Sequence, residues 1–351
     1  MRLMTTDIVK VEILVVTNSL SGGGAERASN VLVNALHNLG VNVALVAINS
    51  GPSDFVALNC LFFELNRPWP GSIFSTIKAW FKMQVLINKI KPTFLVLNCD
   101  LPEFICSLLF FQGQIVVVEH AARPWPTRVF IGKGVRWLLR QRKAKWVAVS
   151  NHLSIWPNNT TPDVAINNPV IPNAMHTLDT STEPNSARII HIGRLIDSKQ
   201  PDWVLELAHR LNRQCVFIGS GKMELQMKEL ALNKSINAVF AGFTKDPWSL
   251  VKNGDLVVIT SREEGDGLVL VEAILHNVAF LAHNIADFEK FNLPPNSICS
   301  SIDDFEVKAR KFFQGDLKLE LSQDFKLDIL KLRDPKLIGN QWIRFLFGNA
   351  D

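Results

Sequence analysis

The chain is most tightly constrained by one stretch, residues 256–275, in which two apolar runs flank a turn that contains glycine. Residues 256–259 are all leucine, valine or isoleucine, which predicts a short buried strand. Residues 268–275 have the length and apolar density of a helix that packs on a sheet. A buried strand that leads directly into a packed helix is typical of parallel sheets, so this stretch predicts an α/β fold.

The turn between the two runs, Glu-Gly-Asp-Gly at residues 264–267, is suited to binding a phosphate group. Gly265 and Gly267 allow the backbone to bend sharply and a ligand to approach it closely. The amides of Gly267, Leu268 and Val269 would then face that ligand at the positive end of the helix. We therefore expect the turn to hold a phosphate.

Two carboxylates flank this turn, Glu264 before it and Glu272 eight residues later, about two helical turns along and on nearly the same face. Carboxylates repel phosphate but accept hydrogen bonds from hydroxyl groups. A phosphate site between two carboxylates suits a ligand with sugars on either side of a diphosphate, which is the layout of a nucleotide sugar. An acidic turn that is merely solvated is the alternative that this stretch leaves open.

The pattern Glu-Gly-x-Gly-Leu-Val-x-x-Glu resembles that of the retaining glycosyltransferases of family 4, many of which build bacterial surface polysaccharide or lipopolysaccharide. The resemblance implies a GT-B fold, in which two Rossmann-like domains face each other across a cleft. It also implies that Glu264 contacts the donor sugar as part of the catalytic set and that Glu272 contacts the ribose. Asp266 departs from the pattern, because an aromatic residue is usual there, and it adds a carboxylate beside the expected sugar pocket. Residues 283–291 also depart from the resemblance, because a glycine-rich loop is usual there.

A chain of 351 residues is long enough for two domains with separate cores. We expect an acceptor-binding Rossmann-like domain at residues 1–175 and a nucleotide-sugar-binding one at 188–336. The polar, proline-containing segment 176–187 is the expected linker. By the resemblance, the last helix, about 337–351, packs back on the first domain.

Cysteine usage and hydropathy point to a cytoplasmic protein. The five cysteines are scattered and include no Cys-x-x-Cys pair, so they predict neither a disulfide framework nor a zinc site. The N-terminal apolar run is too short for a signal peptide. No apolar run reaches the ~18 residues that a membrane-spanning helix needs.

A second glycine-rich loop, residues 18–27, lies between a predicted strand at 11–17 and a predicted helix at 28–39. Gly23 and Gly24 would expose amides that can receive a phosphate or sugar oxygen. The dinucleotide-binding pattern G-x-G-x-x-G fails, because the last glycine is replaced by arginine. Gly-Gly-Ala-Glu-Arg at this place also resembles family 4, although such a turn is often purely structural.

His120 follows a predicted strand at residues 115–118. Ligands of open α/β sheets bind at the carboxyl ends of the strands, so we expect His120 to point toward the ligand site. Family 4 members often place a histidine there near the donor sugar, and the resemblance gives His120 a catalytic role. A hydrogen-bonded structural histidine is the alternative.

Charge is distributed unevenly along the chain. Residues 1–175 contain 16 basic and 9 acidic residues, a net charge of +7, whereas the remainder has 21 basic and 24 acidic residues. Segment 121–162 has no acidic residue and mixes aromatic with basic side chains: Arg123, Trp125, Arg128, Phe130, Lys133, Arg136, Trp137, Arg140, Arg142, Lys143, Lys145 and Trp146. This mixture suits an anionic membrane surface. No nucleic-acid-binding motif accompanies it, and a solvated helix face is the plainer alternative.

The second half restarts the alternation of strands and helices, and its first loop is basic. Arg194 can bind two oxygens at once and Lys199 adds a compact charge, a pair suited to a diphosphate. Gly193-Arg194-Leu195, with lysine five residues after the arginine, resembles the family pattern that binds the donor pyrophosphate. The resemblance assigns further substrate contacts to Asn173 at the domain junction, Gly219 after the next strand, and Phe243 and Thr244 beside the nucleobase.

These residues predict a retaining glycosyltransferase that moves a hexosyl group from a nucleoside diphosphate sugar to a glycan or lipid-linked glycan at the cytoplasmic membrane face. We expect neither a cofactor nor a metal, because no Asp-x-Asp motif follows a predicted strand. A nucleotide-sugar epimerase of the same architecture is one alternative. A catalytically silent membrane-adaptor protein is another, and Asp266 favours it.

Overall fold

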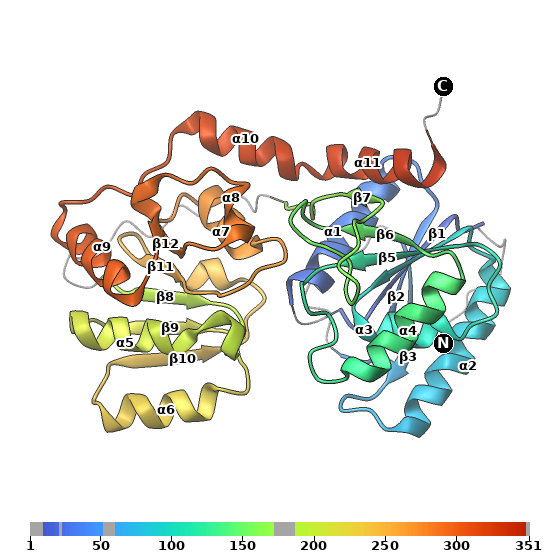
Figure 1. Ribbon diagram of the computed structural model, residues 1–351, viewed down its shortest axis with the longest axis horizontal. Helices are drawn as coiled ribbons and strands as arrows, with labels where there is room; N and C mark the ends of the chain where they lie inside the picture. The colour runs from blue at the N-terminus through green and yellow to red at the C-terminus, as the bar shows by residue number, and fades with distance from the viewer. Residues whose placement is uncertain (1–9, 21–22, 52–59, 172–186, 349–351) are drawn as a thin grey trace. The chain divides into compact units, whose positions relative to one another are not determined.

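A computed structural model describes residues 10–20, 23–51, 60–171 and 187–348 (Figure 1). Its contacts divide the chain into two compact units. Unit 1 comprises Met1–Ile171 and Leu332–Asp351, and unit 2 comprises Pro172–Lys331. Asn173 and almost all of the expected linker, 176–187, lie outside the described residues.

Unit 1 is built on a seven-stranded parallel sheet in the order β3-β2-β1-β4-β5-β6-β7. Val15 at its centre pairs with Leu45 on one side and Val96 on the other. Apolar runs form these strands because both faces of the sheet are covered. The strands are β1 (Ile13–Thr17), β2 (Val43–Asn49), β3 (Leu61–Arg67), β4 (Phe94–Asn98), β5 (Gln114–Glu119), β6 (Lys145–Ala148) and β7 (Val164–Ala165).

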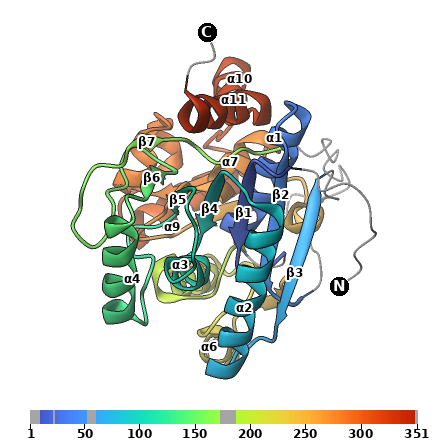
Figure 2. The ribbon, with the colours of Figure 1, turned by 90° about the vertical axis from the view of Figure 1, so that its right-hand side faces the viewer.

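Helices cover both faces of this sheet (Figure 2). One face packs against α2 (Ile73–Ile90), α3 (Asp100–Ser107) and α4 (Val129–Gln141). The other packs against α1 (Gly24–Asn38) and α11 (Pro335–Phe347), whose Ile338, Trp342 and Leu346 join the core formed by α1. The C-terminal helix therefore completes the core of unit 1, although all of unit 2, Pro172–Lys331, precedes it in the sequence.

Unit 2 repeats this layout with a six-stranded parallel sheet in the order β10-β9-β8-β11-β12-β13. Its strands are β8 (Ile189–Ile192), β9 (Cys215–Ile218), β10 (Ala238–Gly242), β11 (Leu256–Ile259), β12 (Phe280–His283) and β13 (Ile298–Cys299). Its helices are α5 (Pro201–Leu211), α6 (Glu224–Asn233), α7 (Leu268–Leu275), α8 (Ala286–Glu289), α9 (Ile302–Gln314) and α10 (Gln323–Arg333), the last of which ends in unit 1. Short 3₁₀ turns occur at η2 (Asp197–Lys199), η3 (Pro247–Leu250) and η4 (Pro295–Ser297).

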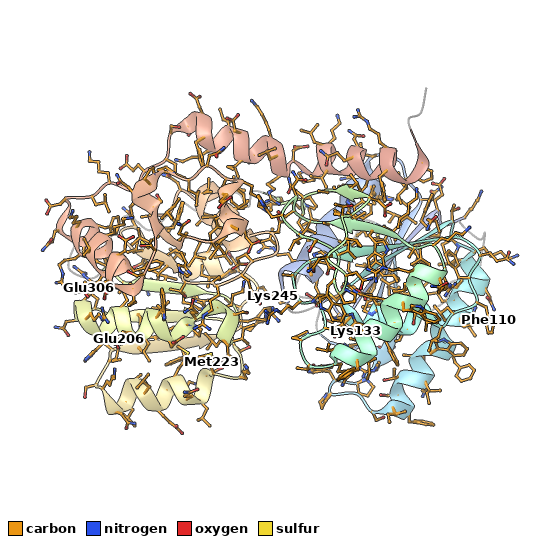
Figure 3. All side chains as sticks on the ribbon, viewed as in Figure 1. Phe110, Lys133, Glu206, Met223, Lys245 and Glu306 are labelled. Carbon is orange, nitrogen blue, oxygen red and sulfur yellow. The ribbon has the colours of Figure 1, made fainter. Side chains whose placement is uncertain are left out.

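Arg210 of α5 joins the outer helices of unit 2 through an exposed ion network. Its side chain contacts Glu206 of α5 at 3.0 Å and Glu306 of α9 at 3.2 Å (Figure 3). Such exposed pairs contribute little each, and the buried core formed by α5, α9 and the sheet carries most of the packing.

The α/β fold predicted from the sequence is confirmed, and so are the strand at 256–259 and the helix at 268–275. Helix α3 runs from Asp100 to Ser107. Asp100 and Glu103 place two carboxylates in the first turn of α3, where the helix dipole favours negative charge. Strand β3 was not predicted, because an edge strand with partly exposed side chains lacks a continuous apolar run.

Part of the basic segment 121–162 is wrongly assigned to the surface. Arg136 is fully buried, and its guanidinium bridges Glu103 at 2.6 Å and Glu119 at 2.5 Å. Burial alone would lower the pKa of Arg136, but the two carboxylates raise it above its ordinary value, so the arginine stays charged. Trp125, whose indole donates to Glu103, and Trp146 are also buried.

Arg142 has a structural role of a different kind. It donates to the carbonyl oxygens of Cys106, Ser107 and Phe111, at and beyond the C-terminal end of α3. A cation at this end of a helix satisfies carbonyls that have no partner within the helix. No described helix combines the length and the apolar content needed to cross a bilayer.

Candidate functional site

Helix α7 begins where the sequence predicted, directly after the glycine turn. Gly267 precedes it with φ of +73°, in the left-handed region that favours glycine. A Cβ at this position would lie 2.9 Å from Cε1 of Phe288, so space also restricts the residue. The first amides of α7, from Leu268 on, have no partner within the helix and are available to an anion. Gly265 lies within the same turn and is partly buried.

Glu264 is held in place from three directions. Its Oε1 lies 2.5 Å from Nζ of Lys199 and accepts a hydrogen bond of 2.7 Å from Ser261. Its backbone amide donates to Asp287 at 2.8 Å. The structure thus brings together Lys199 and Glu264, which are 65 residues apart and were predicted separately. Glu264 lies in the turn, so the expected shared helix face with Glu272 is wrong: α7 begins four residues later.

Hydrogen bonds to backbone carbonyl oxygens fix the loop that carries Arg194 and Lys199. Thr260, directly after β11, donates to the carbonyl oxygen of Lys199 at 2.8 Å, and the Arg262 amide donates to that of Ser198 at 2.9 Å. Arg194 itself is exposed. These contacts hold the basic loop beside the glycine turn, where a diphosphate could reach both.

Gly219 supports this basic loop from the next strand. A Cβ on Gly219 would lie 2.0 Å from the carbonyl oxygen of Gly193, so the two backbones can approach only without a side chain. Both glycines also have positive φ, 146° for Gly193 and 138° for Gly219. Their predicted substrate contacts remain predictions, and the packing explains why glycine is needed.

Glu272 is buried in the second turn of α7 and accepts a hydrogen bond of 2.8 Å from the indole of Trp248. The Trp248 ring stacks on His276 with the ring centroids 4.9 Å apart. The sequence analysis missed Trp248, which precedes Glu272 by 24 residues. Only its place among apolar residues before β11 could have suggested burial, and its partner could not be predicted.

The two residues predicted beside the nucleobase follow β10. Phe243 is half exposed and Thr244 is partly buried. An exposed aromatic ring at the carboxyl end of a strand provides a stacking surface, which agrees with the predicted role without testing it.

Asp266 is neither solvated nor alone. Its side chain is only 4% exposed, and Oδ1 lies 3.2 Å from Nζ of Lys290, which follows α8. The feature that departs from the sequence pattern is therefore a buried, charge-paired group. Lys290 also was not predicted.

In unit 1, the structure places His120 next to Asn98. Its Nε2 lies 2.7 Å from Oδ1 of Asn98, the last residue of β4. Asn98 is buried and its Nδ2 has no hydrogen-bond partner among the described residues. Both line a small pocket with room for about one water molecule, bounded also by Ser29 of α1 and Trp342 of α11.

The glycine loop of unit 1 is described only in part. Gly23 is extended and precedes α1, which begins at Gly24. Three residues later, the Arg27 amide bonds to the Gly23 carbonyl. The contact of Gly23 and Gly24 with a ligand stays a prediction.

Comparisons with known proteins agree with this geometry. Residues 179–291 match the family model for glycosyl transferases group 1, and this match covers the loop of Arg194, the glycine turn and Lys290. A curated relative, poly(ribitol-phosphate) alpha-N-acetylglucosaminyltransferase of Staphylococcus aureus, is 24% identical over 166 residues. That alignment covers 44% of this chain and 34% of the relative, so the match spans about a third of the relative's length.

Solved structures resemble the whole chain. Sucrose-phosphate synthase from Thermosynechococcus elongatus has a TM-score of 0.78 at 14% identity and covers 96% of this chain and 99% of its own. A TarM variant from S. aureus, crystallised with fondaparinux, alpha-GlcNAc-glycerol and UDP, has a TM-score of 0.74 at 11% identity, covering 97% and 100%. HepE from Anabaena in complex with UDP scores 0.71 at 15% identity, covering 97% and 100%. The chain has the GT-B type of α/β fold of these neighbours.

Proposed function

We propose that the protein is a retaining glycosyltransferase that moves a hexosyl group from a nucleoside diphosphate sugar to a hydroxyl of a glycan or lipid-linked glycan. Unit 2 would bind the nucleotide sugar and unit 1 the acceptor. The contact between Lys199 and Glu264, beside the first amides of α7, carries this proposal. The cation of Lys199, the amides of α7 and the carboxylate of Glu264 all lie in the region that matches the group 1 family model.

The proposed reaction breaks the bond between the anomeric carbon and the diphosphate oxygen. Negative charge develops on that oxygen, and fixed positive groups stabilise it most where they are already in place. Arg194, Lys199 and the amides of Leu268 and Val269 are the groups assigned to this role. When a diphosphate binds, Lys199 would exchange part of its contact with Glu264 for the phosphate oxygens.

Carboxylates are assigned to the sugars. Glu264, oriented by Ser261, would accept hydrogen bonds from hydroxyls of the transferred sugar. Glu272, oriented by Trp248, would accept them from the ribose. Phe243 and Thr244 are assigned to the nucleobase, and Gly23, Gly24 and Asn173 to further donor or acceptor contacts.

His120 is assigned to the sugar or to the acceptor hydroxyl. With Asn98 Oδ1 as the acceptor, Nε2 of His120 would carry the proton of the neutral ring. We assign the histidine to exchange a proton with the attacking hydroxyl or to form a hydrogen bond with the sugar.

We also propose that unit 1 docks on the cytoplasmic face of an anionic membrane through α2 and α4. Neither helix contains an acidic residue, and both expose cations, among them Lys78, Lys89 and Lys133. Large apolar side chains are exposed on the same side of the sheet: Ile73, Phe74, Ile77, Phe81 and Val85 of α2, Phe130, Ile131 and Trp137 of α4, and Phe110 after α3. Figure 3 labels Phe110 of this set and Lys133 of α4. Aromatic rings with nearby cations favour the interface of anionic lipid.

Sedimentation with phosphatidylglycerol vesicles tests this docking. The wild type should bind at low salt and dissociate at high salt, because salt screens the cations. Phe130→Ser with Trp137→Ser should bind less, whereas Leu232→Ser, which alters an equally exposed residue of α6, should not. Equal sedimentation of all three would reject the assigned face.

A panel of UDP-linked and GDP-linked hexoses tests the reaction. With a glycan or lipid-linked acceptor, the proposal predicts a product whose anomeric configuration matches that of the donor. An epimerised donor formed without any acceptor would favour the epimerase, and no turnover of any donor would favour a silent binding protein. An inverted product would exclude the retaining mechanism.

A further inference from the structure

Two parts of unit 2 that depart from the family resemblance contact each other. One is Asp266, which stands where an aromatic residue is usual. The other is the segment 283–291, which contains α8 in place of a glycine-rich loop and is called here the support segment. Lys290 of the support segment lies 3.2 Å from Oδ1 of Asp266.

The support segment holds the glycine turn at several points. The Asp287 carboxylate accepts the hydrogen bond of the Glu264 amide at 2.8 Å. Nδ1 of His283 lies 3.1 Å from the carbonyl oxygen of Ser261. The ring of Phe288 leaves no room for a side chain on Gly267. The support segment therefore fixes the backbone on which the phosphate-facing amides depend.

The charges within this contact matter for a diphosphate ligand. Asp266 directly precedes Gly267, and its carboxylate is almost fully buried, so water screens it weakly. A carboxylate left unpaired at this place would repel a diphosphate at the start of α7. Lys290 places a positive charge against this carboxylate, and its side chain is itself only 17% exposed.

We propose that Asp266 and Lys290 form a neutralising pair that keeps the glycine turn able to bind a diphosphate. The inference rests on the proposed function, because it concerns the same donor site. In this role both are positioning residues: Asp266 fixes the turn through Lys290, and Lys290 cancels the repulsion that Asp266 would exert on phosphate. Each departure from the family pattern then accounts for the other.

Calorimetric binding of UDP, GDP and the parent nucleosides tests the pair. Lys290→Met removes a positive charge beside the Asp266 carboxylate, so the affinity for the diphosphate should fall about tenfold while that for the nucleoside stays unchanged. Adding Asp266→Asn to this variant removes the repulsion and should restore the affinity to within about threefold. Lys311→Met, which removes an exposed lysine of α9, is the matched control.

Two further measurements separate charge from shape. High salt should reduce the penalty in Lys290→Met, because repulsion is screened whereas lost packing is not. Lys290→Gln keeps a hydrogen-bond donor for Asp266 without the charge, and it should also lower the affinity for the diphosphate. It replaces Lys290→Met as the test if the methionine variant does not fold.

The outcomes distinguish this inference from the proposed function. If wild type binds neither UDP nor GDP, the donor site itself is rejected and the inference falls with it. If wild type binds a diphosphate but the double variant is as weak as Lys290→Met, then Lys290 contacts the phosphate directly or only supports the fold, and the neutralising pair alone is rejected. An unchanged affinity in Lys290→Met also rejects it.

Discussion

Units 1 and 2 share one sheet order at their centres but use their charged residues differently. In unit 1 the order β3-β2-β1-β4 and in unit 2 the order β10-β9-β8-β11 place a topological switch after the first strand of each sheet. At the switch of unit 1, Asn98 and His120 contact each other, and neither is a carboxylate, lysine or arginine. At that of unit 2, charged side chains gather, with Lys199 and Glu264 in contact.

The charged side chains that pair within unit 1 are more buried than Lys199 and Glu264 of unit 2. The Arg136 guanidinium pairs with the carboxylates of Glu103 and Glu119, and all three side chains have almost no exposure. In unit 2 the pair of Lys199 and Glu264 is partly exposed, at 19% and 13%. A buried, satisfied ion cluster is costly to break, because removal of one partner leaves a buried charge without compensation, whereas a partly exposed pair at a strand end can change partners when a ligand arrives. The same architecture therefore supports a structural use of charge in one unit and a binding use in the other.

Removing the buried arginine should have the largest effect. Arg136→Met leaves two buried carboxylates without a cation, so we expect a loss of about 3–5 kcal/mol in the free energy of unfolding. Urea denaturation measures this, with Arg128→Met, at an exposed position before α4, as the control. A loss below about 1 kcal/mol would mean that charge is not structural in unit 1.

Removing the lysine of the donor site should act on catalysis instead. Lys199→Met should lower kcat/KM by about 30-fold or more, corresponding to about 2 kcal/mol of transition-state stabilisation. Its unfolding free energy should change little, because the pair with Glu264 is partly exposed. Steady-state kinetics measures this against Lys228→Met, a change of an exposed lysine on α6. A variant with wild-type kcat/KM would remove Lys199 from the diphosphate site.

Changes to Asn98 and His120 of unit 1 should have a smaller effect on catalysis. His120→Ala should lower kcat by at least about tenfold, a conservative value for a lost proton acceptor. Asn98→Ala should have a milder effect, because the histidine remains but its tautomer is no longer fixed. His152→Ala, at an exposed histidine of the same unit, should behave as wild type. Equal activity of all three proteins would leave His120 a structural residue.

The smallest expected effect concerns Trp248. Trp248→Phe keeps an aromatic ring on His276 but removes the indole N–H that bonds to Glu272. The KM for the nucleotide sugar should therefore rise about fivefold, corresponding to ~1 kcal/mol for one hydrogen bond. The KM for a nucleotide sugar with 2′-deoxyribose should rise less, because that substrate lacks one hydroxyl that Glu272 would bind. An equal rise for both donors would separate Trp248 from the ribose.

Local pattern was sufficient to predict part of this molecule. The bounds of β11 and α7 follow from apolar density and from Gly267, whose positive φ ends the turn. The strand-end position of His120 follows from the run before it. These features depend on residues close together in the sequence, where periodicity and turn chemistry are informative.

Contacts between distant residues could not be predicted in this way. Nothing near Glu272 indicates that Trp248 will donate to it, and nothing near Asp266 indicates Lys290. Charge counting also failed for Arg136, because composition does not separate a buried cation from an exposed one. Each of these cases requires the packing of helices and loops on the completed sheet.

The most direct test of the account is a crystal structure of the protein with UDP or GDP. The account predicts that the diphosphate oxygens lie within hydrogen-bond distance of the amides of Leu268 and Val269 and of the Lys199 ammonium group, with the ribose hydroxyls at Glu272. A nucleotide bound elsewhere, with Lys199 still paired to Glu264 and no ligand at the start of α7, would contradict it.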